Sequence, residues 1–182
     1  MGLTVLAGRA RHDGCGWRAL ALAHDLIRET VAADTYRVSA EPMQLFAELC
    51  DALALCVHDE AHGVGGLLHL RFLGDEGRTS EATDQELSSL LRLLDGFKKD
   101  VLEHAPPSNA VQARILAHAS PTARTSGVSA TLVDLIKADL ADGKIVCGTQ
   151  TLQRADPVQV CFQPREGRVR ILAPAPASVK TR

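Results

Sequence analysis

The stretch that decides the fold is residues 50–73, CDALALCVHDEAHGVGGLLHLRFL. An almost wholly apolar segment, Met43–Val57, leads into polar residues 58–63, and a second apolar run follows over Val64–Leu73. Periodicity alone leaves the first segment open between helix and strand. Two apolar runs on either side of a short glycine-containing turn nevertheless predict a β-hairpin. We therefore expect a hairpin here, with its turn at residues 58–63.

Strand signals recur on both sides of this hairpin. Short β-prone segments are expected over residues 35–42, Val111–Leu116, Lys144–Thr149, Val158–Phe162 and Arg168–Leu172. The last two segments are joined by the turn residues PREG at 164–167.

Three segments carry apolar residues at helical spacing. The first covers residues 16–33 and predicts an amphipathic helix that precedes the strands. The second begins at Asp84, which we expect to cap it, and should lie on a sheet. The third begins at Ser129 and ends at Gly143, a glycine expected in the C′ position. Strands that alternate with helices predict a mixed α/β domain.

The composition limits the class of protein. With 182 residues and 46% hydrophobic content, the chain suits one globular domain. Its net charge of −2 and lack of a long basic run argue against a nucleic-acid partner or an anionic membrane surface. No apolar stretch approaches the ~20 residues needed to span a bilayer, so we expect a cytoplasmic protein without membrane insertion. Its five cysteines form no CxxC pair, which argues against a zinc knuckle or redox couple.

The hairpin resembles the CheD family of chemoreceptor glutamine deamidases. Family members carry Gly-Ser-Cys at the start of a strand, then an apolar stretch, Asp, a turn and a glycine-containing segment that ends in His. The spacing from Asp59 to His69 matches that pattern without a gap. Counting back from Asp59 places Ala52 at the position of the nucleophilic cysteine. The resemblance spans roughly residues 36–172, with strands and helices in the same order.

This resemblance implies a four-layer α/β/β/α fold in which helices flank two mixed sheets. It also implies three parts of the chain: a helical N-terminal extension over 1–35, a CheD-like domain over 36–172 and a flexible tail over 173–182.

The chain departs from the family pattern in three places, and the loss of glycine in two of them implies a closed or reshaped cleft. Ala117-His118-Ala119 replaces a Gly-Gly-Ala segment, and residues 149–156 lack the glycines of a family turn. A family Thr or Ser that assists catalysis would fall at Phe46 or Ala47, which have no hydroxyl group. Glycine allows a close approach of the backbone to a ligand, so these replacements change the site itself.

The family reaction needs a thiolate that attacks the glutamine carbonyl and a histidine that protonates the leaving ammonia. Ala52 cannot start it, and His69 alone can only act on water. We therefore expect a non-catalytic binding or regulatory protein of a bacterial chemosensory system. The family implies a chemoreceptor cytoplasmic domain or a CheC-like phosphatase as its partner, and no cofactor.

Two other functions are kept open. In the first, the chain is an active cysteine-dependent glutamine deamidase that uses Cys50 and His69, although Cys50 would lie about 6 to 7 Å along a strand from residue 52. In the second, it is an unrelated small α/β interaction module.

His58, His62 and His69 could suggest a metal site, but His58 and His62 lie on a turn without a familiar ligand spacing, so no metal is expected. An engineered replacement at residue 52 is disfavoured, because the neighbouring family residues are also changed, to Cys50 and Asp51.

Overall fold

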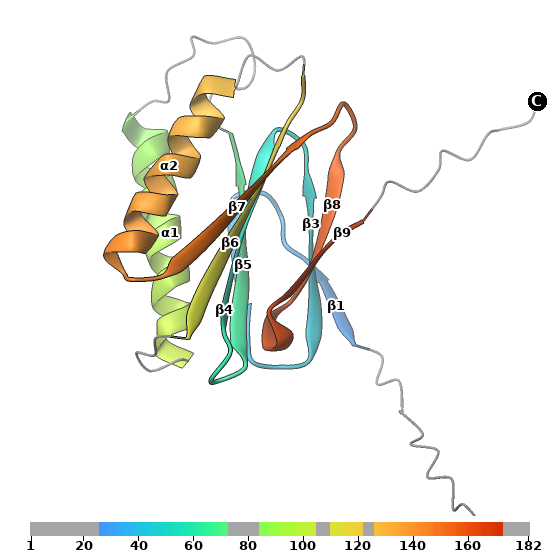
Figure 1. Cartoon of the computed structure of the whole chain (residues 1–182), viewed down its shortest axis with the longest axis vertical. Coiled ribbons are helices and arrows are strands. Elements are labelled where there is room, and N and C mark those ends of the chain that lie inside the picture. The colour runs from blue at the N-terminus through green and yellow to red at the C-terminus, as the bar shows by residue number, and fades with distance from the viewer. Residues whose placement is uncertain (1–25, 73–83, 105–109, 122–125, 173–182) are drawn as a thin grey trace, which may run out of the picture.

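The computed structural model describes residues 26–72, 84–104, 110–121 and 126–172, and Figure 1 shows their arrangement. The helices are α1 (Asp84–His104) and α2 (Ser126–Asp142), and a short 3₁₀ helix, η1, covers Pro164–Glu166. The strands are β1 (Ile27–Thr30), β2 (Thr35–Ser39), β3 (Met43–Leu49), β4 (Ala52–Asp59), β5 (Val64–Arg71), β6 (Val111–Ala119), β7 (Val146–Gln153), β8 (Val158–Gln163) and β9 (Arg168–Leu172).

The strands form two sheets that face each other. The five-stranded sheet has the order β2-β5-β4-β6-β7, and the four-stranded sheet has the order β1-β3-β8-β9. Each sheet contains one parallel pair, β6 with β7 and β1 with β3, while the other pairs are antiparallel. The predicted mixed α/β fold with two mixed sheets is therefore confirmed.

The predicted hairpin is the β4–β5 pair at the centre of the five-stranded sheet, in register from Ala52↔Arg71 to Asp59↔Val64. Asp59 is fully buried, and its carboxylate accepts hydrogen bonds from the backbone N–H groups of Ala61 and His62. Gly63 completes the turn with a φ of 62°, a left-handed conformation that favours glycine. These local hydrogen bonds satisfy polar groups of the turn, and so the turn can close an otherwise apolar hairpin.

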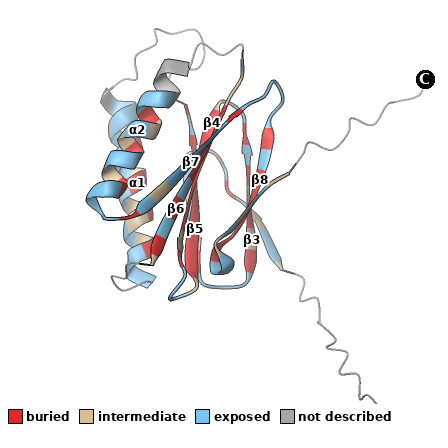
Figure 2. Ribbon diagram, viewed as in Figure 1, coloured by how far each residue is buried: buried red, intermediate tan, exposed pale blue. Residues whose placement is uncertain are grey.

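Strand β4 separates two cores, because its alternate side chains point to opposite faces of the sheet. Leu53, Leu55 and Val57 pack with the helices in one cluster. Ala52, Ala54 and Cys56 pack against the four-stranded sheet in the other. Figure 2 accordingly shows the central strands as the buried part of the molecule.

Both described helices cover the outer face of the five-stranded sheet, so the described residues form three layers (Figure 1). An ion pair of 2.6 Å between Lys98 and Asp139 joins α1 to α2. The fourth layer of the expected α/β/β/α arrangement is not present in the described part of the chain and stays a prediction. No described helix is long and apolar enough to cross a membrane.

The helix predicted over residues 16–33 is wrong for Ile27–Thr30, which form β1. This segment pairs with β3 in parallel, in the register Ile27↔Met43, and that tertiary pairing outweighs its helical spacing. The first part of the expected helix and the tail from residue 173 lie outside the described residues. The division of the chain at residues 35 and 172 stays a prediction.

The end of α2 also differs in detail from the prediction. The left-handed residue is Lys144, with a φ of 58°, and not Gly143. The Lys144 N–H donates to the carbonyl of Ala141, and the Ile145 N–H donates to that of Leu140. This pair of bonds is the Schellman pattern, which assigns Lys144 to C′ and Gly143 to the C-cap.

The two adjacent glycines of β5 are required by close packing. A Cβ added at Gly66 would lie 2.6 Å from Cε2 of Phe97 and 2.9 Å from the Arg37 carbonyl oxygen. We expect Gly66→Ala to lower the free energy of unfolding by about 1–3 kcal/mol, because the core must shift to admit the methyl group.

Urea unfolding followed by circular dichroism measures this effect. Gly148→Ala is the matched control, since nothing lies within 4 Å of a Cβ at that strand position. Equal stability of the two variants would contradict the packing of Gly66 against α1.

Candidate functional site

The strand register brings residues 52 and 69 to the same face. Ala52 pairs with Arg71 and Ala54 pairs with His69, so Ala52 and His69 are diagonal neighbours on β4 and β5. Such neighbours have Cα atoms roughly 7–8 Å apart, within reach of a long side chain. Ala54 belongs to the core between the sheets, so this pair also faces the four-stranded sheet.

His69 is buried, and one of its ring nitrogens is held by the backbone. Its Nδ1 lies 3.1 Å from the carbonyl oxygen of Val31. A carbonyl only accepts, so Nδ1 carries the proton and Nε2 is left as the basic nitrogen. Val31 is held in turn, because its N–H donates to the carbonyl of Phe46 on β3. The arrangement presents Nε2 as a proton acceptor, which is the form a general base needs.

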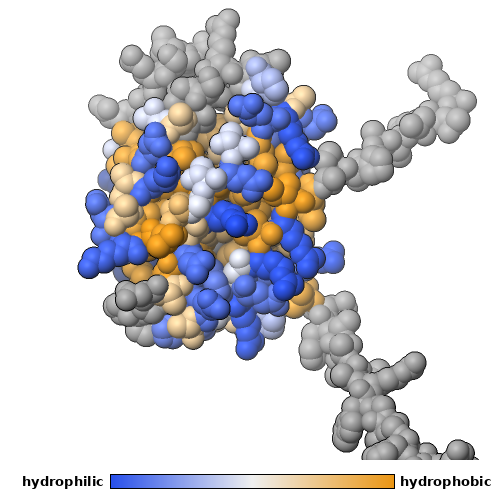
Figure 3. Space-filling view, viewed as in Figure 1, coloured by the Kyte–Doolittle hydropathy of each residue, from blue (hydrophilic) through white to orange (hydrophobic). Residues whose placement is uncertain are grey.

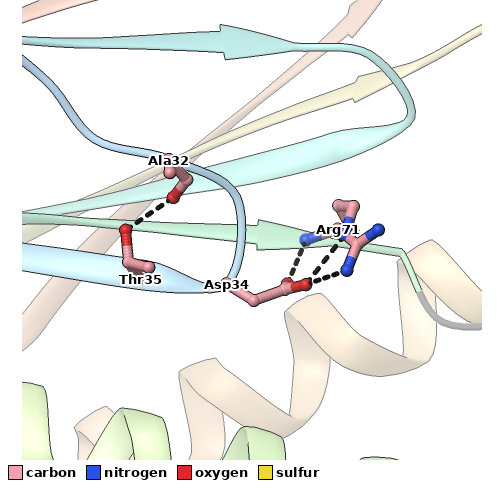
Figure 4. Close-up of polar contacts among 4 residues, drawn as sticks. All are labelled: Ala32, Asp34, Thr35 and Arg71. Carbon is pink, nitrogen blue, oxygen red and sulfur yellow. Dashed lines mark hydrogen bonds and ion pairs between the residues drawn. The ribbon is translucent and has the colours of Figure 1, made fainter.

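A connection between the sheets holds the backbone around His69. The chain leaves β1 at Val31, crosses to the other sheet and enters β2 at Thr35. Within it, the Asp34 N–H donates to the His69 carbonyl, and the Asp34 carboxylate accepts from the Arg71 backbone N–H and from Nε at 2.8 Å. The Thr35 hydroxyl donates to the carbonyl of Ala32 (Figure 4). These bonds hold the connection that contains Val31, whose carbonyl oxygen lies beside the His69 ring.

His118 lies directly across from Ala52 on β6 and is only 1% exposed. Its Nδ1 accepts from the backbone N–H of Asp51 at 3.3 Å, and its Nε2 lies 3.1 Å from the carbonyl of Asp156. The ring therefore carries its proton on Nε2, and both nitrogens are satisfied. An imidazole thus lies beside residue 52 at a position where the resemblance expected glycine.

Asp51 closes this end of the sheet through several contacts. Its carboxylate accepts from the N–H of Ser120 at 2.7 Å, and its carbonyl accepts from the N–H of Phe72 at 3.0 Å. The φ of Asp51 is 45°, which turns the chain sharply into β4. Because the Asp51 N–H is bonded to His118, it is not free to stabilise an oxyanion next to residue 52.

Cys50 is exposed and lies in the connection between β3 and β4. The expectation that Cys50 lies on the same strand as residue 52 is wrong, because β4 begins at Ala52 and Asp51 has a positive φ. Its role as a nucleophile stays a prediction. Phe46 and Ala47 lie on β3, and Ala47 is fully buried in the core between the sheets.

Three other cysteines are poor nucleophiles. Complete burial raises the pKa of the Cys56 thiol to about 12. Burial likewise raises the pKa values of Cys147 and Cys161. Because the thiolate is the reactive form, the raised pKa values lower the reactivity of these three thiols near neutral pH.

The remaining histidines of the hairpin do not converge on His69. Nδ1 of His58 lies 2.8 Å from the carbonyl of Pro164, and Nδ1 of His62 lies 2.9 Å from the Asp59 carboxylate. His58 pairs with Gly65, four residues along β5 from His69, or roughly 13 Å at the rise of a strand. Across the described ranges, no three His, Cys, Asp or Glu side chains are grouped so that they could hold a metal ion.

Of the site residues predicted from sequence, the structure brings Ala52 and His69 together and leaves Cys50 on the surface. Sequence reasoning noted His118 only as the loss of a glycine and missed its hydrogen bonds. The sequence carried one sign of this site, a histidine within the apolar run of β6. In the register of β5, β4 and β6, this histidine lies opposite residue 52.

The buried Cys56 predicts a pH dependence of stability. Below pH 9.0, the ordinary pKa of a thiol, Cys56 is protonated in both the folded and the unfolded chain. Between pH 9.0 and about 12 only the unfolded chain ionises, so the free energy of unfolding falls as the pH rises through this window.

Urea unfolding of the wild-type chain and of Cys56→Ala, compared at neutral pH and within that window, isolates this contribution. We expect the wild-type chain to lose more stability than the variant as the pH rises. Identical losses would show that Cys56 ionises equally in both states.

No protein-family model matches the chain. It is 22% identical over 138 residues to a protein of Burkholderia vietnamiensis (strain G4 / LMG 22486) named as a probable chemoreceptor glutamine deamidase CheD, in a match that covers 75% of this chain and 56% of that protein. The same identity and coverage hold for a protein of that name from Burkholderia orbicola (strain MC0-3). A CheD 1 protein of Ruegeria sp. (strain TM1040), also named as a probable deamidase, is 27% identical over 114 residues, or 62% of this chain and 59% of that protein.

The chain therefore spans little more than half the length of the curated relatives it matches. These weak similarities support the relationship to the CheD chemoreceptor glutamine deamidases that the hairpin predicted.

Proposed function

We propose that this chain is a cytoplasmic CheD-like chemosensory protein that binds its partner without deamidating it. The partner is the cytoplasmic domain of a chemoreceptor or a CheC-like phosphatase. The names of the similar proteins support a chemoreceptor as the partner. The proposal needs no cofactor and no membrane insertion.

The observation that carries the proposal is the environment of residue 52. Ala52 has no nucleophilic atom, is 1% exposed and lies across from the buried ring of His118. A substrate glutamine would have to displace that ring, which would break its bonds to Asp51 and Asp156. Leaving buried polar groups without partners costs about 1–3 kcal/mol for each group, so the closed arrangement is favoured.

In this proposal His69 has a structural role. Its Nδ1–H donates to Val31 and so joins the connection between the sheets to β5. A buried imidazole that is hydrogen bonded to the backbone stabilises this corner without any reaction. The histidine that acts as the base in the family thus serves here to connect the two sheets.

A second candidate function is favoured by one observation, the exposure of Cys50. Its thiol is accessible and lies two residues before Ala52, in the connection that Asp51 fixes. In this alternative the chain is an active glutamine deamidase with Cys50 as nucleophile and His69 as base.

The two candidates differ in a deamidation assay on a purified receptor cytoplasmic fragment. We expect the wild-type chain to bind the fragment or a CheC-like protein in a pull-down at micromolar concentrations. Mass spectrometry should then find every receptor glutamine unchanged, because no thiol lies at residue 52. Cys50→Ala should bind as the wild-type chain does.

Deamidation that disappears in both Cys50→Ala and His69→Ala would instead establish the second candidate. Cys147→Ala is the control for loss of an unrelated thiol, and it should behave as the wild-type chain in every assay. Failure to bind either partner would remove the chemosensory assignment.

A further inference from the structure

The outer face of the four-stranded sheet carries no α-helix in the described part of the chain. Both α-helices lie on the far side of the five-stranded sheet (Figure 1). Leu45, Val160 and Phe162 point the other way, into the core between the sheets. Because side chains alternate along a strand, Phe46 and Cys161 point outward. The described layers therefore leave this face open.

One row of paired residues crosses this face from edge to edge. Thr30 on β1 pairs with Phe46 on β3, Phe46 pairs with Cys161 on β8, and Cys161 pairs with Arg170 on β9. Phe46 is half-buried and Cys161 is 5% exposed. Figure 3 shows both hydrophilic and hydrophobic side chains along the right-hand flank of the molecule, where this sheet lies. The centre of the face is thus weakly polar, and its charged residues lie on the edge strands.

Two arginines approach this centre from opposite edges of the sheet. Arg170 is exposed and lies directly opposite Cys161. Arg28 is exposed on β1 and pairs with Gln44, two residues before Phe46, so it shares the same face. Burial raises the pKa of the Cys161 thiol, and the Arg170 and Arg28 guanidinium groups are close enough to oppose that rise. Two cations therefore converge on a neutral centre.

Among the described residues, no carboxylate forms an ion pair with either of these cations. Arg168, on the same face, differs from them because it pairs with Glu166 at 3.6 Å. Glu48 also points outward on β3 but makes no ion pair with Arg28 or Arg170 in the described ranges. Like charges that converge repel each other, and an anion bound between them removes this repulsion. The face is therefore complementary to negative charge.

We propose that this face binds an acidic segment of a partner protein, with carboxylates on Arg28 and Arg170 and apolar atoms over Phe46. A guanidinium group forms two parallel hydrogen bonds with a carboxylate, which favours arginine at such a surface. The core between the sheets separates this face from residue 52, so binding here does not depend on whether a glutamine is deamidated.

A protein segment fits this face better than a nucleic acid does. A nucleic-acid backbone presents a continuous row of phosphates and needs a dense basic surface. The four strands of this sheet contain no lysine, and the whole chain has a net charge of −2. Two arginines on either side of an aromatic ring instead match a segment that carries both carboxylates and apolar side chains.

Two-dimensional NMR of the full chain, titrated with an octaglutamate peptide at low salt, tests the proposal. We expect the backbone amide signals of β3 and β8 to shift as the peptide is added. Arg28→Glu combined with Arg170→Glu should weaken binding by about tenfold, because two ion pairs become two repulsions. Arg28→Gln combined with Arg170→Gln should also weaken binding, since it removes both ion pairs without adding a charge.

Arg92→Glu combined with Lys137→Glu is the matched control. It changes the net charge by the same amount at exposed positions of α1 and α2, and it should bind the peptide as the wild-type chain does. Circular dichroism confirms that each variant is folded. A wild-type chain whose β3 and β8 signals do not move would overturn the proposal, as would an equal loss of binding in the control. Tighter binding of octathymidylate than of octaglutamate would also overturn it and assign the face to nucleic acid.

Discussion

Burial of β4 on both faces is the constraint on which the rest of the structure depends. One set of its side chains contacts the helices, and the alternate set contacts the four-stranded sheet. A shift of one residue in pairing would exchange the two sets and place leucines where the alanines now fit. The register with β5 and β6 is therefore strongly specified. That register brings Ala52, His69 and His118 to the space between the sheets.

The residues around Ala52 form a coherent hydrogen-bonded network. A buried imidazole costs free energy unless its nitrogens find partners, and both nitrogens of His118 do, at Asp51 and Asp156. Asp51 in turn holds the end of β6 through Ser120. Under the proposed function, Ala52 removes the nucleophile and the His118 ring closes the end of the sheet at which a side-chain amide would bind.

Local signals explain what the sequence could predict. The β4–β5 hairpin follows from two apolar runs and a polar turn, and the ungapped spacing within it makes Ala52 and His69 diagonal neighbours. Strand β1 could not be predicted, because its helical spacing is local and its pairing with β3 is not. The hydrogen bonds of His118 could not be predicted either, because its partners lie 67 and 38 residues away in the chain. Whether Cys50 or His69 takes part in a reaction is still a prediction.

In the proposed function, the space beside residue 52 is closed and also lacks a thiol. The most direct measurement is the rate at which iodoacetamide modifies the thiol introduced by Ala52→Cys, in a Cys50→Ala background, with and without His118→Gly. The account predicts slow modification in the presence of His118 and faster modification once the ring is removed, with both proteins folded by circular dichroism. Fast modification while His118 is present would show an open cleft at residue 52 and contradict the account.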